Sequence, residues 1–409
     1  MSIKKHLFSL AAAIFLLSQP LWSAAFSGYA GAKLNYAPDT DSVTYNPTLE
    51  MQAFIQGQFT FSQNLWTHLE FSIDTKDLIS TELFHSTDAS FNIDELSLIF
   101  RTKIESQSNY FSAFMGTYEP IGSDIFLQRY FGIKPIDSKL TESWLGIAGS
   151  ILYPHFGIGL SDVVKFNGIP AATGLYLYLN HEDDSVFVFN TDFRTALATR
   201  FLTVDFAAGI GFPLSNKYSG NEIIFAVVEI YLHAGTTLLL GNSYTPALFI
   251  QAGLNNAEFN KKLEKLAFGP ENIYLMVEPR FKIGNLRLHV SAYSLPEDTV
   301  EKLMFIDNTL GVGLNFFTDA VSWGSQRVNI GILISGSIPG KNFYDLLAPM
   351  DLFNNYVKTL QFDVSANPYI STYFLGGTIS TELSVQVMDC ITGQWKTAIS
   401  GNFGYKSSF

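Results

Sequence analysis

Two short Ser-Asp pairs are the residues whose types best suit nucleophilic chemistry. They are Gly122-Ser123-Asp124 and Leu160-Ser161-Asp162. A serine nucleophile needs an oriented base within hydrogen-bond reach, and tripeptides this short arise by chance. The sequence also contains no GxxxxGK[ST], CxxC or HExxH motif. A barrel phospholipase or protease is therefore disfavoured, and we predict that the protein is not an enzyme and uses no cofactor.

One acidic stretch offers oxygen ligands for a divalent cation. It runs His181-Glu182-Asp183-Asp184, and a solvated turn is the preferred interpretation, so no metal site is predicted. The single cysteine, Cys390, excludes an intramolecular disulfide.

Composition sets the class of structure that must position any such groups. The chain has 409 residues with 36 Phe and 19 Tyr, and only 15% of its residues are charged. After residue 25 no segment offers the roughly 18 consecutive apolar residues of a spanning helix. The apolar side chains are abundant but interrupted, which favours strands.

The N-terminal segment has the pattern of a secretory signal peptide. A basic start with Lys4 and Lys5 precedes a short apolar run, and small residues end it at Ser23-Ala24-Ala25. We expect residues 1–25 to be removed and the mature chain to begin near Phe26. Removal lowers the net charge from −12 to −14, and nucleic-acid binding is disfavoured because it needs clustered positive charge.

Alternation of apolar and polar residues runs through most of residues 26–409. Segments of about ten alternating residues separated by turns are typical of a membrane-spanning barrel. In residues 378–387, one face holds Ile379, Leu383, Val385 and Val387, and the other holds Thr378, Ser380, Glu382, Ser384 and Gln386. We predict an all-β fold, a single antiparallel transmembrane β-barrel of about 16 to 18 strands, with 18 as the best count.

The strand count depends on two interpretations. Nineteen candidate strands can be counted, and residues 144–161 are merged into one because such barrels have an even number. With both termini periplasmic, short inner turns are expected at residues 62–64, 234–235 and 284–285. Long outer loops are expected at 77–91, 119–143, 254–271, 295–308 and 338–358. Helical patterns are expected within two of these, at 256–268 and 342–357.

The chain ends on an aromatic strand, with Phe403, Tyr405 and Phe409 on one face. With the signal peptide and the alternation, this resembles outer-membrane β-barrel proteins of the porin class from Gram-negative-type bacteria, spirochaete versions included. The resemblance implies an outer-membrane location in a diderm bacterium and a last strand read by the barrel-assembly machinery. Ser407 departs from the apolar residue usual at that position.

The same resemblance implies that the third outer loop, 119–143, folds into the lumen as a constriction. Strand already begins at Phe26, so no N-terminal plug is expected, and a wall of this size encloses a water-filled channel. By parity the lumen face carries the charges that the lipid face cannot. The predicted pore-lining residues are Glu95, Arg101, Lys103, Arg129, Glu278, Arg280, Lys282, Arg287 and His289.

The hairpin around Gly284-Asn285 gives a specific register. Lys282 should pair with Arg287 and Arg280 with His289, which gathers four basic side chains with Glu278 as their nearest acidic partner. The leading hypothesis is a passive pore for small hydrophilic solutes, compatible with a homo-oligomer in the lipid bilayer. The alternatives are a surface barrel whose outer loops bind host or partner molecules, and a transporter of hydrophobic substrates.

Overall fold

The computed structural model describes residues 25–409 apart from several short ranges. The residues left out are 39–46, 76, 80–88, 137, 143–151, 154, 184–185, 217–222, 226–228, 243–245, 261–264, 268, 270–271, 301–302, 304, 307, 319–320, 324–325 and 343–361. The predicted signal peptide and the helical pattern at 342–357 fall outside the described residues, the latter almost wholly.

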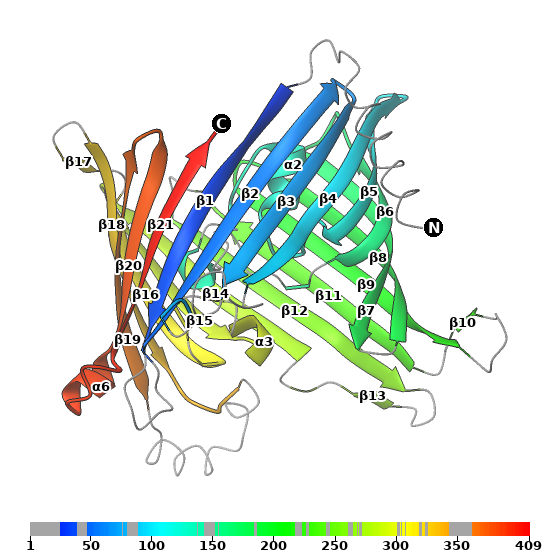
Figure 1. Cartoon of the computed structure of the whole chain (residues 1–409). Helices are drawn as coiled ribbons and strands as arrows, with labels where there is room; N and C mark the ends of the chain where they lie inside the picture. Colours follow the sequence, from blue (N-terminus) through cyan, green and yellow to red (C-terminus); the bar gives the residue numbers. More distant parts are fainter. Residues whose placement is uncertain are drawn as a thin grey trace, which may run out of the picture.

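The described chain forms one closed antiparallel β-barrel (Figure 1). One sheet holds 21 strands, and three of these, β10 (Ile223–Phe225), β13 (Lys265–Ala267) and β17 (Val321–Trp323), are short extensions, which leaves eighteen in the wall. The wall strands are β1 (Ala25–Ala37), β2 (Thr48–Ser62), β3 (Leu65–Thr75), β4 (Ala89–Ile104), β5 (Gln107–Thr117), β6 (Phe156–Lys165), β7 (Ala171–Asp183), β8 (Val186–Ala198), β9 (Leu202–Asn216), β11 (Glu229–Leu240), β12 (Ala247–Asn260), β14 (Ile273–Ile283), β15 (Leu286–Ser294), β16 (Leu310–Thr318), β18 (Gln326–Ser337), β19 (Asp363–Phe374), β20 (Gly377–Gln386) and β21 (Ile399–Ser408). The described helices are α2 (Ile125–Phe131), α3 (Glu297–Val300), α6 (Val387–Ile391) and the 3-10 helix η1 (Lys139–Thr141).

The ring closes where the first strand meets the last. β1 pairs with β21 in antiparallel register, with Tyr36 opposite Gly401 and Tyr29 opposite Ser408. Backbone hydrogen bonds join Gly28 and Phe409 in both directions, at 3.0 and 2.9 Å. Closure leaves no sheet edge unpaired, which is what a β-structure requires in hydrocarbon.

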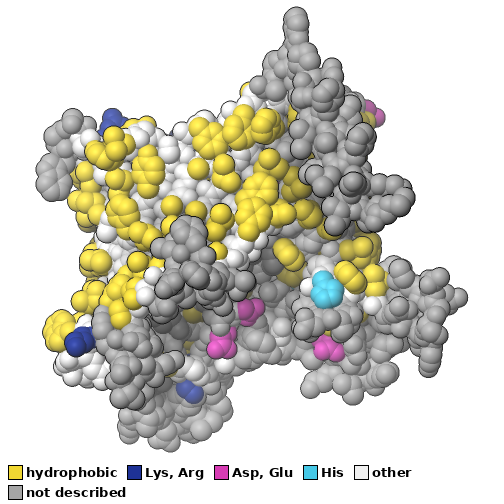
Figure 2. Space-filling model, in the orientation of Figure 1, with side chains coloured by type: hydrophobic (Ala, Val, Ile, Leu, Met, Phe, Trp, Pro, Cys, Tyr) yellow, Lys and Arg dark blue, Asp and Glu magenta, His cyan; other side chains and the backbone are white. Residues whose placement is uncertain are grey.

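The two-residue period sorts side chains between the outside and the lumen. On β20, Leu383 is 46% exposed on the outer surface whereas its neighbour Glu382 is 4% exposed inside. Figure 2 shows apolar side chains over the outer wall, with the few visible charged groups near its rims. Among the described residues, no helix has the length and apolarity to cross a membrane.

The two rims differ in their connections. Both chain ends of the wall lie on the rim that carries the tight turns, such as Leu375-Gly376 with φ of 49° and 79°. Positive φ at both central residues matches the twist of the flanking strands. The opposite rim carries α6 and the long connections (Figure 1).

Three expectations about local structure were wrong, although the total of eighteen strands was right. Residues 234–235 are not a turn but lie within β11, and the chain turns after Leu240 at Gly241, whose φ is 104°. Residues 254–260 continue β12, and 265–267 form β13, so the loop starts later than expected and the helical pattern is not realised. Their apolar positions suit a strand equally well, because short periodic runs fit both periods.

The third error concerns residues 144–161, which do not form one wall strand. β6 begins only at Phe156, and Tyr153 instead forms a bridge with Ile121 inside the barrel. Pro154 has no N–H for a ladder hydrogen bond, which argues against a continuous strand there.

Candidate functional site: the barrel interior

An inward segment, residues 118–142, follows β5 and lies within the barrel. Several of its apolar side chains are fully buried, with Ile121, Phe126, Leu127 and Ile136 at 0% exposure. The resemblance to porin-class barrels implied that residues 119–143 fold into the lumen, and the described part of this segment lies there. It carries α2 and η1, and these pack against β8 and β16, so the segment crosses from one side of the wall to the other.

The segment is fixed where it leaves the wall. Glu119 has a positive φ of 45°, which costs a non-glycine residue energy unless its surroundings impose it. Three groups hold it: Tyr176 donates to Glu119 Oε2 at 2.5 Å, Arg129 contacts Oε1 at 2.8 Å, and Arg194 Nη1 donates to its carbonyl at 2.6 Å.

Arg194 is the centre of this attachment. Its side chain is fully buried and makes a bidentate pair with Asp205, with Nε–Oδ1 at 2.9 Å and Nη2–Oδ2 at 2.5 Å. Its guanidinium also lies 4.2 Å from the ring centroid of Phe126. The sequence analysis missed this pair. The sequence shows that Arg194 and Asp205 are charged residues at inward positions of β8 and β9. It does not show that they pair, because that depends on the register between the two strands.

A second buried cluster lies on the same side of the barrel. Asp192 accepts a hydrogen bond from Tyr178 at 3.0 Å and lies 3.1 Å from His155 Nε2 and 2.7 Å from His233 Nε2. The side chains of Asp192 and both histidines are 0% exposed. His155 Nδ1 also lies 3.2 Å from the carbonyl oxygen of Tyr118, so the cluster helps to fix the start of the inward segment.

The far end of the inward segment is fixed to the opposite wall by polar contacts. Arg280 donates to the Pro135 carbonyl at 2.9 Å, and Ser138 donates to Glu278 at 2.6 Å. Lys139 forms ion pairs with Glu142 and with Glu382 on β20. Burial alone would lower the pKa of Lys139, but the two carboxylates outweigh it and raise the pKa above its ordinary value.

Arg129, on α2, joins the segment to a third part of the wall. Its guanidinium lies 3.0 Å from Glu95 on β4 and 2.8 Å from Glu119. Burial acts to lower the pKa of Arg129, but Glu95 and the neighbouring groups raise it well above the ordinary value. The group therefore stays charged.

A second segment that folds inward was not expected from sequence. In the connection between β15 and β16, the buried side chains are Leu295, Val300, Leu303, Phe305 and Ile306. Lys139 lies 4.8 Å from the ring centroid of Phe305, so the two inward segments touch. Residues 295–308 were predicted to be an outer loop, because the apolar residues in this connection do not alternate regularly with polar ones.

Three cavities remain beside these segments inside the barrel. Their volumes are about 740, 730 and 450 Å³. Arg287, His289 and Phe317 line both of the larger two. Lys134 lines the second and third, and Lys406 the first and third. The shared lining residues make the three cavities neighbours along one lumen.

The second cavity, which we call the cationic cavity, has a lining of one sign. Its charged lining residues among those described are Lys134, Arg200, Arg280, Lys282, Arg287 and His289 when protonated. No carboxylate lines it in the described part of the chain. Residues of tight-turn strand ends, Thr199 to Phe201 and Gly241, also line it, which places it at that rim.

The predicted hairpin register is confirmed. Arg280 pairs with His289, Lys282 with Arg287, and Ile283 with Leu286. Like charges directly opposite each other in a ladder need a compensating charge. Glu278 supplies it, because it lies 2.7 Å from Arg280 Nε and 3.3 Å from His289 Nδ1.

The other candidate pore-lining residues have different surroundings. Glu95 is buried at 1% exposure and Arg129 faces the 450 Å³ cavity. Arg101 pairs across the ladder with Tyr110 and Lys103 with Ser108, near the turn that joins β4 to β5. Neither Arg101 nor Lys103 lines the three cavities.

The Ser-Asp pair at 123–124 serves the structure of the inward segment. Ser123 donates to the Pro120 carbonyl at 2.7 Å, and Asp124 accepts from the Ile136 N–H at 2.9 Å. Ser161 lies on β6, where its exposure is 6%. Of the acidic stretch at 181–184, Asp184 lies outside the described residues.

The aromatic residues of the last strand lie on the outer surface. Phe403 and Phe409 are 48% and 49% exposed, and Phe26 stacks on Phe409 with ring centroids 5.0 Å apart. Tyr405 lies opposite Ala32 of β1 and Ile379 of β20.

Comparison with known proteins adds little to this geometry. No family model and no curated protein match the chain. Among solved structures, Salmonella typhi OmpF in complex with daunomycin is 11% identical, covering 94% of this chain and 97% of that one, with a TM-score of 0.42. A mutant of the Rh. blastica porin is 6% identical over 95% and 100% of the two chains, with a TM-score of 0.39. OmpT, an outer membrane protein of Vibrio cholerae, is 9% identical over 96% and 99%, with a TM-score of 0.37.

Because these TM-scores are below 0.5, the architecture is assigned from the strand pairing of this chain alone. The fold is a closed eighteen-strand antiparallel barrel. It is the architecture that the resemblance to porin-class barrels implied, and that prediction is confirmed.

Proposed function

We propose that the protein is an outer-membrane pore for passive diffusion of small hydrophilic solutes, and that it favours anions. The observation that carries the proposal is the cationic cavity within a closed barrel, where basic residues line about 730 Å³ of lumen. Low-dielectric walls focus the field of such charges and raise the local concentration of counter-ions. The preference arises although the whole chain carries a net charge of −12.

The outer surface supports the membrane location. Large apolar side chains are exposed on many wall strands, among them Ile158 at 65%, Leu160 at 61%, Phe193 at 50% and Phe403 at 48%. A soluble protein rarely exposes a contiguous apolar surface of that kind, whereas a lipid-facing band is what a membrane barrel needs. The short-turn rim would then face the periplasm.

The inward segment supports a constricted rather than a wide pore. It crosses the lumen and is bound to β4, β14 and β20 through Arg129, Ser138 and Lys139. Solutes would pass between this segment and the wall strands whose side chains line the cavities.

Planar-bilayer recording with the refolded mature chain, residues 26–409, tests the proposal. Stepwise conductance with a reversal potential on the anion side under a salt gradient is expected. Silence across many insertions of correctly folded barrel would refute the pore. Ligand binding by cells without conductance would instead favour the surface-scaffold alternative.

We also propose that the aromatic last strand is the signal read by the barrel-assembly machinery. The exposed side chains of Phe403 and Phe409 support this, because Phe403 lies on the strand that closes the ring and Phe409 directly follows it, bonded to Gly28 of β1. Deletion of Phe409 should lower the amount of heat-modifiable barrel in cells while refolding into detergent persists. Leu375→Asn, a substitution of an exposed residue at an inner turn, serves as the control. Normal cellular levels of the Phe409 deletion would contradict the assembly role.

A further inference from the structure

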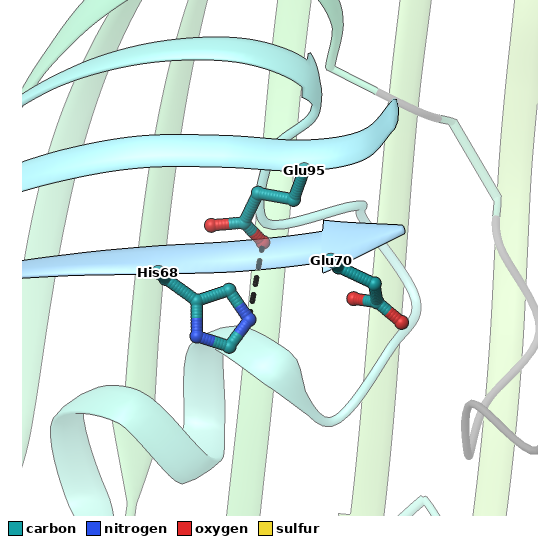
Figure 3. A group of neighbouring side chains, drawn as sticks. All are labelled: His68, Glu70 and Glu95. Atoms are coloured by element: carbon teal, nitrogen blue, oxygen red, sulfur yellow. Dashed lines mark ion pairs between the residues drawn. The ribbon is translucent and has the colours of Figure 1, made fainter. Parts of the chain in front are cut away.

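Three potential metal ligands converge on one stretch of the lumen wall. His68 and Glu70 are two residues apart on β3 and share its inner face, and Glu95 lies directly opposite Glu70 on β4. Figure 3 shows the imidazole of His68 and the carboxylates of Glu70 and Glu95 gathered in front of the inward segment. One ligand atom from each lies within 4.8 Å of the other two.

The pairing of two carboxylates across the ladder requires compensation. Like charges directly opposite each other destabilise a strand pair, and Glu70 and Glu95 are only 5% and 1% exposed. Arg129 contacts Glu95 Oε1 at 3.0 Å, but it also contacts Glu119. Among the described residues no ion pair reaches Glu70, which accepts one long hydrogen bond, of 3.5 Å, from Gln56.

The imidazole of His68 is oriented toward the same point. Its Nε2 lies 4.0 Å from Glu95 Oε2 and 2.8 Å from Gln56 Nε2. An amide N–H donates to Nε2 only if that nitrogen carries a lone pair, so the contact selects the tautomer with the proton on Nδ1. A metal ion needs the same lone pair on Nε2, so the ion would displace the hydrogen bond from Gln56.

The room for an ion and its water ligands is present. His68, Glu70 and Gln56 line the 450 Å³ cavity, so the cluster is buried in the wall yet open on one side. Zinc in proteins is found with three protein ligands and water in the open fourth position. Calcium and magnesium prefer six or more oxygen ligands, which the imidazole does not suit.

We propose that His68, Glu70 and Glu95 form a lumenal binding site for a divalent transition-metal ion, for which Zn²⁺ is the probe. The ion binds the imidazole Nε2 and one oxygen of each carboxylate, and water from the cavity completes its coordination. Small side-chain rotations bring the three ligand atoms from the present spacing to the roughly 2.0–2.2 Å metal distances of such ligands.

The site also meets the inward segment through Glu95. Arg129 on α2 binds the same carboxylate, so an ion there weakens one attachment of the segment and adds positive charge beside the lumen. Zn²⁺ should therefore shift the reversal potential further toward anions. This second effect rests on the proposed pore function, whereas binding itself does not.

Calorimetric titration of tag-free, detergent-refolded protein with Zn²⁺ tests the site. One ion per chain is expected, and His68→Asn and Glu70→Gln should each weaken binding by more than about 10-fold, the lower bound for loss of even a second-shell partner. Neither His68 nor Glu70 forms an ion pair with Arg129, so both variants should keep the inward segment attached. Heat modifiability of each variant checks that the barrel forms.

Two matched variants provide the controls. Glu50→Gln removes an exposed carboxylate from β2, and His181→Asn removes an exposed histidine from β7; both should bind as the wild type does. Absence of binding by the wild type, or equal binding by the His68 and Glu70 variants, would overturn the site. Binding without conductance would leave the site standing and refute the pore.

Discussion

The two sides of the lumen use the same residue types in opposite ways. On the side of β8 and β9, Arg194 is fully buried and bound by Asp205 in two hydrogen bonds, beneath the start of the inward segment. On the side of β14 and β15, Arg287 and Arg280 line a cavity, although Arg280 also pairs with Glu278. A buried charge must be paired or it destabilises the protein, whereas a charge beside water keeps a field that acts on solutes.

The presence of charged residues inside the barrel therefore does not by itself determine ion selectivity. Asp192, His155 and His233 contact one another in a fully buried cluster. They attach the inward segment to the wall. The charged groups that line the three cavities, by contrast, are mainly basic.

The largest expected effect comes from breaking the buried side. Arg194→Ala leaves Asp205 unpaired and removes the donor to the Glu119 carbonyl, so we expect a loss of about 3–5 kcal/mol in the free energy of unfolding. Chemical denaturation of the refolded barrel measures it. Limited proteolysis should also cut within residues 118–142. Arg200→Ala, at an inner turn, should change stability by less than about 0.5 kcal/mol, and equal stability of the two variants would contradict the assignment.

Removing charge from the cationic cavity should change selectivity, and it should also lower stability because Arg280 pairs with the buried Glu278 and donates to the Pro135 carbonyl. Arg280→Ser with Arg287→Ser should shift the reversal potential toward cations at low salt. The double variant removes two positive charges from the cavity lining and takes away the arginine partner of Glu278. The shift should diminish in about 1 M salt, where the screening length falls to ~3 Å. Lys396→Ser, an exposed position in the outer connection before β21, is the control. An unchanged potential at low salt would exclude this hairpin from the selectivity.

The difference in hydration between the two sides can be measured directly. In a Cys390→Ser background, a cysteine at Ser380, which lines the 740 Å³ cavity, should react with a membrane-impermeant maleimide. A cysteine at Ala196, buried at 2% exposure beside Asp205, should react severalfold more slowly. Similar rates at both sites would mean that water reaches the buried side as well.

The smallest effect is expected where the inward segment meets β20. Lys139→Met removes the ion pairs with Glu142 and Glu382. Because both carboxylates line a cavity whose water can solvate them, the loss should be smaller than the one expected for Arg194→Ala. Because the pKa of Lys139 is raised in the folded protein, its contribution is complete below the ordinary lysine pKa of about 10.4 and is lost only as pH rises through the raised value. The difference in stability between wild type and variant should therefore be constant from neutral to mildly alkaline pH. Lys341→Met is the control, and a difference that vanishes near neutral pH would contradict the pairing.

The wall could be predicted from sequence because its signal is local. A period of two fixes which residues face out, and a short turn such as Gly284-Asn285 fixes the register of its hairpin. An error arose where a residue pair typical of turns lies inside a strand. Ala234-Gly235 looked like a turn, yet it is strand because its neighbours on β9 and β12 pair with it.

The interior could be predicted only in outline. That residues 119–143 fold inward came from a resemblance, and the charged faces came from parity. The partners did not, because Glu119 with Arg194, or Glu95 with Arg129, meet only after the whole ring sets which strands are neighbours. The grouping of His68, Glu70 and Glu95 was missed for the same reason, since its members are separated by the register of two strands.

The contact between Lys139 and Glu382 joins residues that are 243 positions apart in the chain. Glu382 lies on β20, the last strand but one, so this attachment of the inward segment can form only after nearly the whole chain has entered the wall. The shape of the lumen is then a property of the finished ring. A chain stopped before β20 would lack both the strands that close the ring and the final support of the inward segment.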